Sequence, residues 1–75
     1  MQKVADKIIA ELKALIELNK SIKEMSPADE DYDFICNDFD PRRTFVIGTI
    51  IFFQEELKPF EGEILDLVNE LEGRV

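Results

Sequence analysis

The chain contains no histidine and only one cysteine among its 75 residues, and each shortage excludes a class of chemistry. Without an imidazole base, neither Cys36 nor any Ser or Thr hydroxyl has the partner that activates it as a nucleophile. Helical di-iron sites of the Glu-x-x-His type are excluded for the same reason. The three glycines are too scattered along the sequence to cradle a phosphate. We therefore expect no catalytic residues and no cofactor, and we expect Cys36 to be a small core residue.

Long apolar runs are also missing. The longest mostly apolar run, Phe45 to Phe53, has nine residues, whereas a membrane span needs ~20. The N-terminus alternates apolar and charged residues, unlike the apolar core of a signal peptide. A lone cysteine cannot form a disulfide within the chain and is typical of a reducing compartment. These features predict a cytoplasmic protein with no membrane contact, folded as a single helical domain over residues 1–75.

Positive charge is scarce after residue 25. Residues 1–25 carry five lysines and four acidic residues, a net charge of +1, whereas residues 26–75 carry four basic and thirteen acidic residues, a net charge of −9. Nucleic-acid binding depends on Lys and Arg facing phosphates, so direct binding to nucleic acid is disfavoured. The basic doublet Arg42–Arg43 is expected to pair with Asp38 or Asp40 instead. The acidic balance fits either a basic protein partner or solubility alone.

Residues 2–24 form the clearest predicted helix. Ala, Leu, Lys and Glu dominate it, and all are strong helix formers. Its apolar residues recur at steps of three and four, which places them on one helical face: Val4, Ala5, Ile8, Leu12, Leu15, Leu18 and Ile22. Ile9 and Ile16 widen this face, so we expect the helix to contact more than one neighbour.

Further helices are expected at about 27–37, 41–57 and 60–72, which gives an all-α bundle of three to four helices. Ser26–Pro27 and Asp40–Pro41 each combine a capping side chain with a proline suited to the first helical position. The segment from Phe45 to Phe53 is rich in β-branched and aromatic residues and could be strand-like in part. No second segment of equal quality could pair with such a strand, so the helix is preferred.

The helix expected at 41–57 is apolar on two sides. One broad face comprises Val46, Ile47, Ile50, Ile51, Phe53 and Leu57. Phe45 and Phe52 lie apart from that face, seven residues from each other. A helix that is apolar on both sides should be buried on both sides. Phe45 and Phe52 therefore face a second subunit, or else both faces belong to the core and this helix is central in the bundle.

The segment DEDYDFICNDFD has the ligand spacing of a calcium loop at Asp29, Asp31, Asp33, Asn37 and Asp40. Its sixth position is Phe34, where such a loop needs glycine, and its twelfth is Asp rather than a bidentate Glu. A helix starting at Ser26–Pro27 would also spread the carboxylates around its axis. We therefore expect no metal site. Instead, we interpret the acids of this segment as a partner-binding acidic surface: Asp29, Glu30, Asp31, Asp33, Asp38 and Asp40.

Two functional hypotheses follow. The first is a small acidic, non-catalytic protein–protein interaction module that self-associates, as a homodimer, through apolar helix faces. The second is an acidic inhibitor of a nucleic-acid-binding protein, of phage or immunity type, which would imitate nucleic acid or block a basic groove. The second rests on an analogy of size and charge. Salt-sensitive capture of a nucleic-acid enzyme would favour the inhibitor, and recovery of the protein alone would favour self-association.

Overall fold

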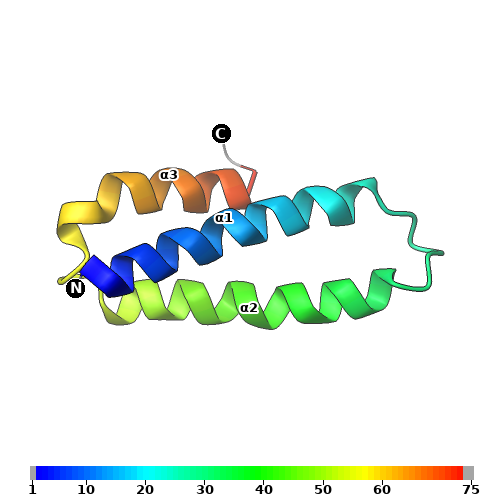
Figure 1. Cartoon of the computed structure of the whole chain (residues 1–75), viewed down its shortest axis with the longest axis horizontal. Helices are drawn as coiled ribbons and strands as arrows, with labels where there is room; N and C mark the ends of the chain where they lie inside the picture. Colours follow the sequence, from blue (N-terminus) through cyan, green and yellow to red (C-terminus); the bar gives the residue numbers. More distant parts are fainter. Residues whose placement is uncertain (1, 74–75) are drawn as a thin grey trace.

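The computed structural model describes residues 2–73, which form three α-helices and one short 3₁₀ turn. The helices are α1 (Gln2–Glu24), α2 (Tyr32–Phe52) and α3 (Glu61–Leu71), and the 3₁₀ turn η1 (Lys58–Phe60) precedes α3. No strand occurs within residues 2–73. The predicted all-α bundle is therefore confirmed, including the preference for a helix in the β-branched segment. The molecule is elongated, 42 × 22 × 16 Å (Figure 1).

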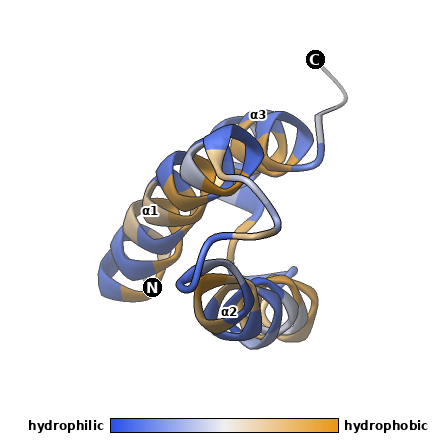
Figure 2. Ribbon diagram, turned by 90° about the vertical axis from the view of Figure 1, so that its right-hand side faces the viewer, coloured by the Kyte–Doolittle hydropathy of each residue, from blue (hydrophilic) through white to orange (hydrophobic). Residues whose placement is uncertain are grey.

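α1 is the central helix, and its bounds are those predicted from the sequence. It runs antiparallel to α2 and packs against both α2 and α3, whereas α2 and α3 make little contact with each other (Figures 1 and 2). This arrangement confirms the expectation that the wide apolar face of α1 contacts more than one neighbour. It also corrects one alternative, because the helix that carries Phe45 and Phe52 is not the central one.

The hydrophobic core lies where α1 meets its two neighbours. Ala5, Leu12 and Leu15 have no exposed surface. Among residues 2–73, the buried core residues are Ala5, Ile8, Leu12, Leu15, Ile16, Val46, Leu57, Ile64 and Leu71. Most of them come from α1, while α2 contributes only Val46, so α2 leaves much of its apolar surface outside the core.

The start of α2 differs from the prediction, because it begins at Tyr32 rather than after Ser26. Ser26 Oγ accepts a hydrogen bond from the Ala28 N–H at 3.2 Å, and Asp29 Oδ2 accepts one from the Ser26 N–H at 3.3 Å. These reciprocal bonds resemble the capping box of a helix start, but only isolated turns follow, with Asp29 N–H bonded to the Ser26 carbonyl and Tyr32 N–H to the Asp29 carbonyl, before α2 begins. Residues 25–31 also reverse the chain between antiparallel helices. A helix starting at residue 27 would leave only residues 25–26 for that reversal, at the short end of the roughly two to five residues that such connections use.

α2 continues through Pro41, so the predicted break between two separate helices is wrong. Pro41 lacks the N–H that would bond to the Asn37 carbonyl, a defect that costs about 3 kcal/mol in a helix interior. Contacts on both sides of the proline offset this cost. Phe39 packs against the core, and Arg42 binds Glu11 of α1. Asp40 is consequently an exposed residue inside the helix and not its cap.

The C-terminal end of α2 also differs, since the helix stops at Phe52 and not near residue 57. Residues 53–57 form turns, and Leu57 enters the core from this connection. Pro59 lies in η1, so the helix does end before this proline, as predicted. After α3, Gly73 adopts a φ of +74°, in the left-handed region that favours glycine at helix ends.

Replacing Pro41 with alanine is expected to raise the free energy of unfolding by about 1–3 kcal/mol, because alanine restores the missing N–H. Pro41 is exposed, so the change removes no core contact. Urea unfolding followed by circular dichroism would measure the gain. Thr44→Ala is the matched control, since Thr44 is also exposed on α2 and, at a protein concentration low enough to keep the chain monomeric, should change stability by about 0.5 kcal/mol or less. Equal stability of Pro41→Ala and the unmodified protein would contradict the proposed cost.

Candidate interaction surfaces

Three phenylalanines lie along one exposed line of α2. Phe34, Phe45 and Phe52 are 77%, 77% and 79% exposed. Phe45 and Phe52 follow Phe34 by 11 and 18 residues, which are close to three and five turns of an α-helix. The three side chains therefore share one side of the helix, and we call them the phenylalanine stripe. Pro41 and Gly48, both exposed, fall on the same side between them.

The ring of Phe52 is held by its neighbour Phe53. The two ring centroids lie 4.9 Å apart at an interplanar angle of 78°, which is the edge-to-face arrangement that aromatic pairs favour. Phe53 packs against the core, whereas Phe52 remains exposed. The end of the phenylalanine stripe is therefore attached to the core through an aromatic contact.

A shallow hollow of about 280 Å³ flanks the phenylalanine stripe on the side of α1. It is lined by Val4, Lys7, Ile8 and Glu11 of α1 and by Phe45, Val46 and Thr49 of α2. Thr49 Oγ1 donates a hydrogen bond to the Phe45 carbonyl at 2.8 Å, so its hydroxyl is satisfied within α2. The hollow is mostly apolar, and Lys7 and Glu11 supply its charges. Lys7 is therefore the cation placed beside Phe45.

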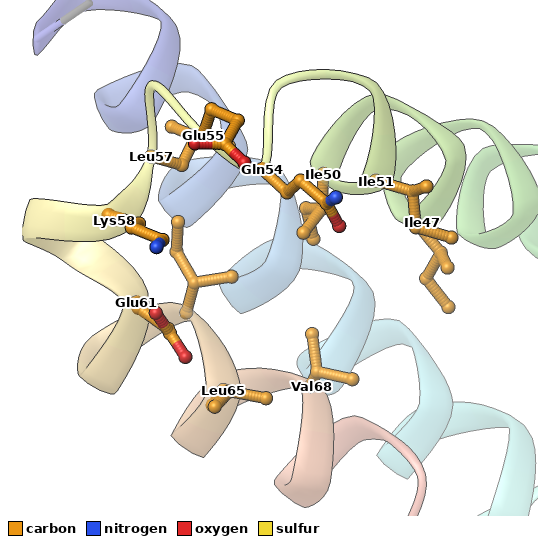
Figure 3. Close-up of a pocket in the computed structure, with 11 residues that line it drawn as sticks. Ile47, Ile50, Ile51, Gln54, Glu55, Leu57, Lys58, Glu61, Leu65 and Val68 are labelled. Atoms are coloured by element: carbon orange, nitrogen blue, oxygen red, sulfur yellow. The ribbon is translucent and has the colours of Figure 1, made fainter.

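A larger apolar groove of about 460 Å³ opens between α2 and α3 (Figure 3). It exists because both helices pack on α1 and make little contact with each other. Its apolar lining is Ile47, Ile50, Ile51, Leu57, Ile64, Leu65 and Val68, and its polar rim is Gln54, Glu55, Lys58 and Glu61. Ile51 and Leu65 are 63% and 50% exposed. A space of this volume can accept a small apolar ligand or a few side chains.

The groove and the phenylalanine stripe occupy neighbouring sides of α2. Ile51 lines the groove and directly precedes Phe52 in α2. In Figure 2, hydrophobic residues lie on several sides of α2 and not only toward α1. Beyond Ile47 and Val68, Arg43 Nη2 and Glu72 Oε1 form an ion pair at 3.5 Å that links α2 to the end of α3. The apolar surface of α2 is thus far larger than its contact with α1 requires.

The six acidic residues predicted as a binding surface are all exposed, but they do not converge on one point. They comprise three in the turn before α2 and three in the first half of α2: Asp29, Glu30, Asp31, Asp33, Asp38 and Asp40. Asp38 Oδ2 accepts a hydrogen bond from Arg42 Nη1 at 3.2 Å. Within residues 2–73 no three His, Cys, Asp or Glu side chains gather as metal ligands. The segment makes one end of α2 strongly negative.

Arg42 links α2 to α1 through a two-point ion pair. Its Nη2 and Nε donate to Glu11 Oε1 and Oε2 at 2.7 and 3.2 Å, while Nη1 donates to Asp38. The hydrogen bond with Glu11, followed by that with Asp38, raises the pKa of Arg42 above its ordinary value. Because folding raises this pKa, the stabilisation is fully present below the unfolded pKa and is lost only as pH rises through the folded one. Mild alkali therefore leaves the pair intact.

The pairing of Arg42 with Asp38 agrees with the sequence expectation, but the bond to Glu11 was not anticipated.

Glu11→Gln is expected to lower the free energy of unfolding by roughly 0.5–1 kcal/mol, because the pair of Arg42 and Glu11 is only partly shielded from water. Urea unfolding would measure the loss. Glu17→Gln provides the control, since Glu17 and Lys20 form a 3.5 Å pair on the exposed side of α1. An equally large loss of unfolding free energy for Glu17→Gln would contradict the claim that the Arg42–Glu11 pair is the more stabilising of the two.

Cys36 is half-buried and lies outside the core cluster, so the expectation of a core cysteine is wrong. The electrostatic interaction with the Cys36 side chain, together with a hydrogen bond to it, raises the pKa of Tyr32 above its ordinary value. The ordinary value is already near 10. Tyr32 therefore stays a neutral phenol at physiological pH.

No helix in the described part of the chain is long and apolar enough to cross a membrane. No protein-family model, curated protein or solved structure matches the sequence or the fold. What the chain does is therefore inferred from the surfaces described above.

Phe34 is the member of the phenylalanine stripe that sequence patterning misses. Its spacing from Phe45 becomes informative only when one helix runs through Pro41, whereas the sequence signals divide that segment in two. The groove has no local signal at all, because it depends on how α2 and α3 are placed around α1.

Proposed function

We propose that this chain is a small acidic, non-catalytic protein–protein interaction module that self-associates as a homodimer through the phenylalanine stripe. The observation that carries the proposal is the position of three phenylalanine rings, each more than three-quarters exposed, on one line of α2. Contiguous exposed apolar surface on a soluble protein marks an interaction site. Aromatic residues are also enriched at interfaces. The lone cysteine fits a cytoplasmic setting.

The size of the surface supports this proposal. The accessible surface of the chain is 5371 Å² at a mass of 8.7 kDa, whereas a compact monomer of that mass exposes ~4700 Å². The radius of gyration is 13.4 Å, compared with ~11.4 Å for a compact domain of this length. The excess surface approaches the ~800 Å² that each partner buries in a standard interface. A second copy covering α2 would remove most of this excess.

A second copy is favoured because the stripe is chemically uniform. Residues that dominate the binding energy of an interface tend to pair with similar residues on the partner. A two-fold dimer meets this condition by presenting the same patch from both molecules. The phenylalanine stripe can therefore supply both sides of its own interface.

Light scattering after size exclusion tests self-association directly. Across low to high micromolar concentrations, the expected mass rises to twice the 8.7 kDa of the chain. A mass of 8.7 kDa at every concentration would contradict the proposal.

The acidic segment from Asp29 to Asp40 favours a second candidate function, inhibition of a nucleic-acid-binding protein through a basic groove. Its six acidic side chains are exposed, and the segment contains no basic residue. A pulldown from the native host at low and raised salt would test this role, because exposed charge pairs are screened by salt. The informative variant replaces the carboxylates of Glu30, Asp33 and Asp40 with neutral side chains. The control removes Glu63, Asp66 and Glu70, which are exposed acids of α3.

Capture of a nucleic-acid-binding protein that is lost with the first variant, but kept with the second, would support the inhibitor. Equal loss with both variants would attribute capture to net charge alone and would contradict a specific acidic surface.

A further inference from the structure

We infer that the second copy binds antiparallel, so that α2 of one molecule runs along α2 of the other in the opposite direction. The two-fold axis passes near residue 43. This inference rests on the self-association proposed above and specifies which residues meet. Two independent features carry it, namely the layout of the phenylalanine stripe and the unequal charge of the two ends of α2.

The layout of the stripe fixes the register. Phe34 and Phe52 mark its two ends, 18 residues or about 27 Å apart along the helix. Full overlap of two antiparallel stripes places Phe34 at the height of the partner's Phe52. It also places Phe45 at the height of the partner's Pro41. All three rings of each copy are then covered, and the midpoint of the overlap is residue 43.

Gly48 fits the same register. At the midpoint of 43, Gly48 lies at the height of the partner's Asp38. A Cβ atom added to Gly48 would meet nothing within 4 Å, so the surface there is open. The facing helix can therefore approach α2 closely at Gly48 without displacing any side chain.

Charge decides the direction of the partner helix. The six acids from Asp29 to Asp40 lie at the N-terminal end of α2, without a basic residue among them. The opposite end of α2 is close to neutral, at a net charge of −1, because Lys3, Lys7 and Lys58 offset three of the four acids Asp6, Glu55, Glu56 and Glu61. A parallel pair would place one acidic end against the other, and such like-charge contacts oppose association. An antiparallel pair places each acidic end against a neutral one.

Specific lysines lie on the correct flank for this arrangement. Lys7 lines the hollow beside Phe45 and Thr49, and Glu11 lines the same hollow. Arg42 bonds to both Glu11 and Asp38, so Asp38 lies on this flank too. In the antiparallel register Lys7 points toward the partner's Asp38. Lys3, exposed one turn earlier on the same side of α1, extends this positive edge.

The area is sufficient for a stable contact. Covering three exposed phenylalanine rings removes about 450 Å² per copy, at roughly 150 Å² for each ring. Pro41, Gly48 and the exposed flanks at Asn37, Thr44 and Ile51 supply the remainder of the ~800 Å² expected per partner. In this arrangement Lys3 and Lys7 of each copy also lie beside the acidic end of α2 in the other copy.

Single-cysteine cross-linking tests the orientation, in a Cys36→Ser background. Asn37, Thr44 and Ile51 are exposed on one line of α2 at seven-residue steps, beside the stripe. Thr44→Cys lies next to the two-fold axis and is expected to form a disulfide with its own copy under mild oxidation. The two copies of Asn37→Cys would lie about 18 Å apart along the helices. That distance is too long for a disulfide, so self-linking should be at least about tenfold slower.

A mixture of Asn37→Cys and Ile51→Cys should link across the interface, because in the antiparallel register these two positions lie only about 3 Å apart along the helix axis. Self-linking of Asn37→Cys as fast as that of Thr44→Cys would overturn the antiparallel orientation while leaving self-association intact. Light scattering on each reduced variant separates the two proposals. A mass of 8.7 kDa throughout, without specific links, would overturn self-association and with it this inference.

Discussion

Leu12→Ala is expected to lower the free energy of unfolding by about 3–5 kcal/mol. Leu12 has no exposed surface and lies near the middle of α1, the helix on which both other helices pack. Truncation there removes apolar contacts and leaves a cavity that two neighbouring helices would have to fill. A domain of this length has a total stability of roughly 4–11 kcal/mol. The variant should therefore lose between about a quarter and all of the stability of the fold.

Leu65→Ala is the matched control for this substitution. It makes the same chemical change on α3 at a side chain that is half exposed, and about 1 kcal/mol or less should be lost. Both variants should be unfolded in urea at one fixed protein concentration, because dimerisation makes apparent stability depend on concentration. Similar losses for the two leucines would contradict the placement of the core around α1.

Phe52→Asp is expected to weaken self-association by at least about a hundredfold, or about 2.7 kcal/mol, while the helical circular dichroism signal is retained. In the proposed dimer Phe52 is covered by an apolar partner surface, so a carboxylate at this position would lose its hydration without a compensating bond. In the monomer Phe52 is exposed, and the same substitution should disturb the fold little. Light scattering across a dilution series would measure the shift.

Leu65→Asp serves as the control for Phe52→Asp. It also places a carboxylate on an exposed apolar residue, but at the far wall of the groove on α3. Dimer formation should persist in this variant. If Leu65→Asp dispersed the dimer and Phe52→Asp did not, the interface would lie in the groove and not on the stripe.

The first helix could be predicted from sequence because its evidence is local. Its apolar residues follow the helical period without interruption, and its composition agrees with that pattern. The second helix could not be bounded in this way, since Ser26–Pro27 and Asp40–Pro41 are strong local start signals. Contacts between residues far apart in sequence overrule them. Arg42 binds Glu11 across 31 positions, and residues 25–31 form the connection in which the chain reverses direction.

Some features of the candidate surfaces could likewise be predicted from local sequence, whereas others depend on packing. The spacing of the sequence predicts that Phe45 and Phe52 lie apart from the broad apolar face of their helix. In the structure both side chains are exposed. Their role in an interface stays a prediction. Phe34 joins them only because α2 is continuous, and the groove arises from the placement of α2 and α3 on α1. Those features are properties of packing that no short segment encodes.

The most direct test of the central claim is an NMR dilution series that follows backbone amide signals of the ¹⁵N-labelled protein. The phenylalanine stripe and Gly48 should shift with concentration, because they enter or leave the interface. Glu63 and Asp66, exposed on α3, should not shift. Spectra that do not change with concentration, or changes confined to Leu65 and Val68 in the groove, would contradict the claim that α2 pairs with a second copy.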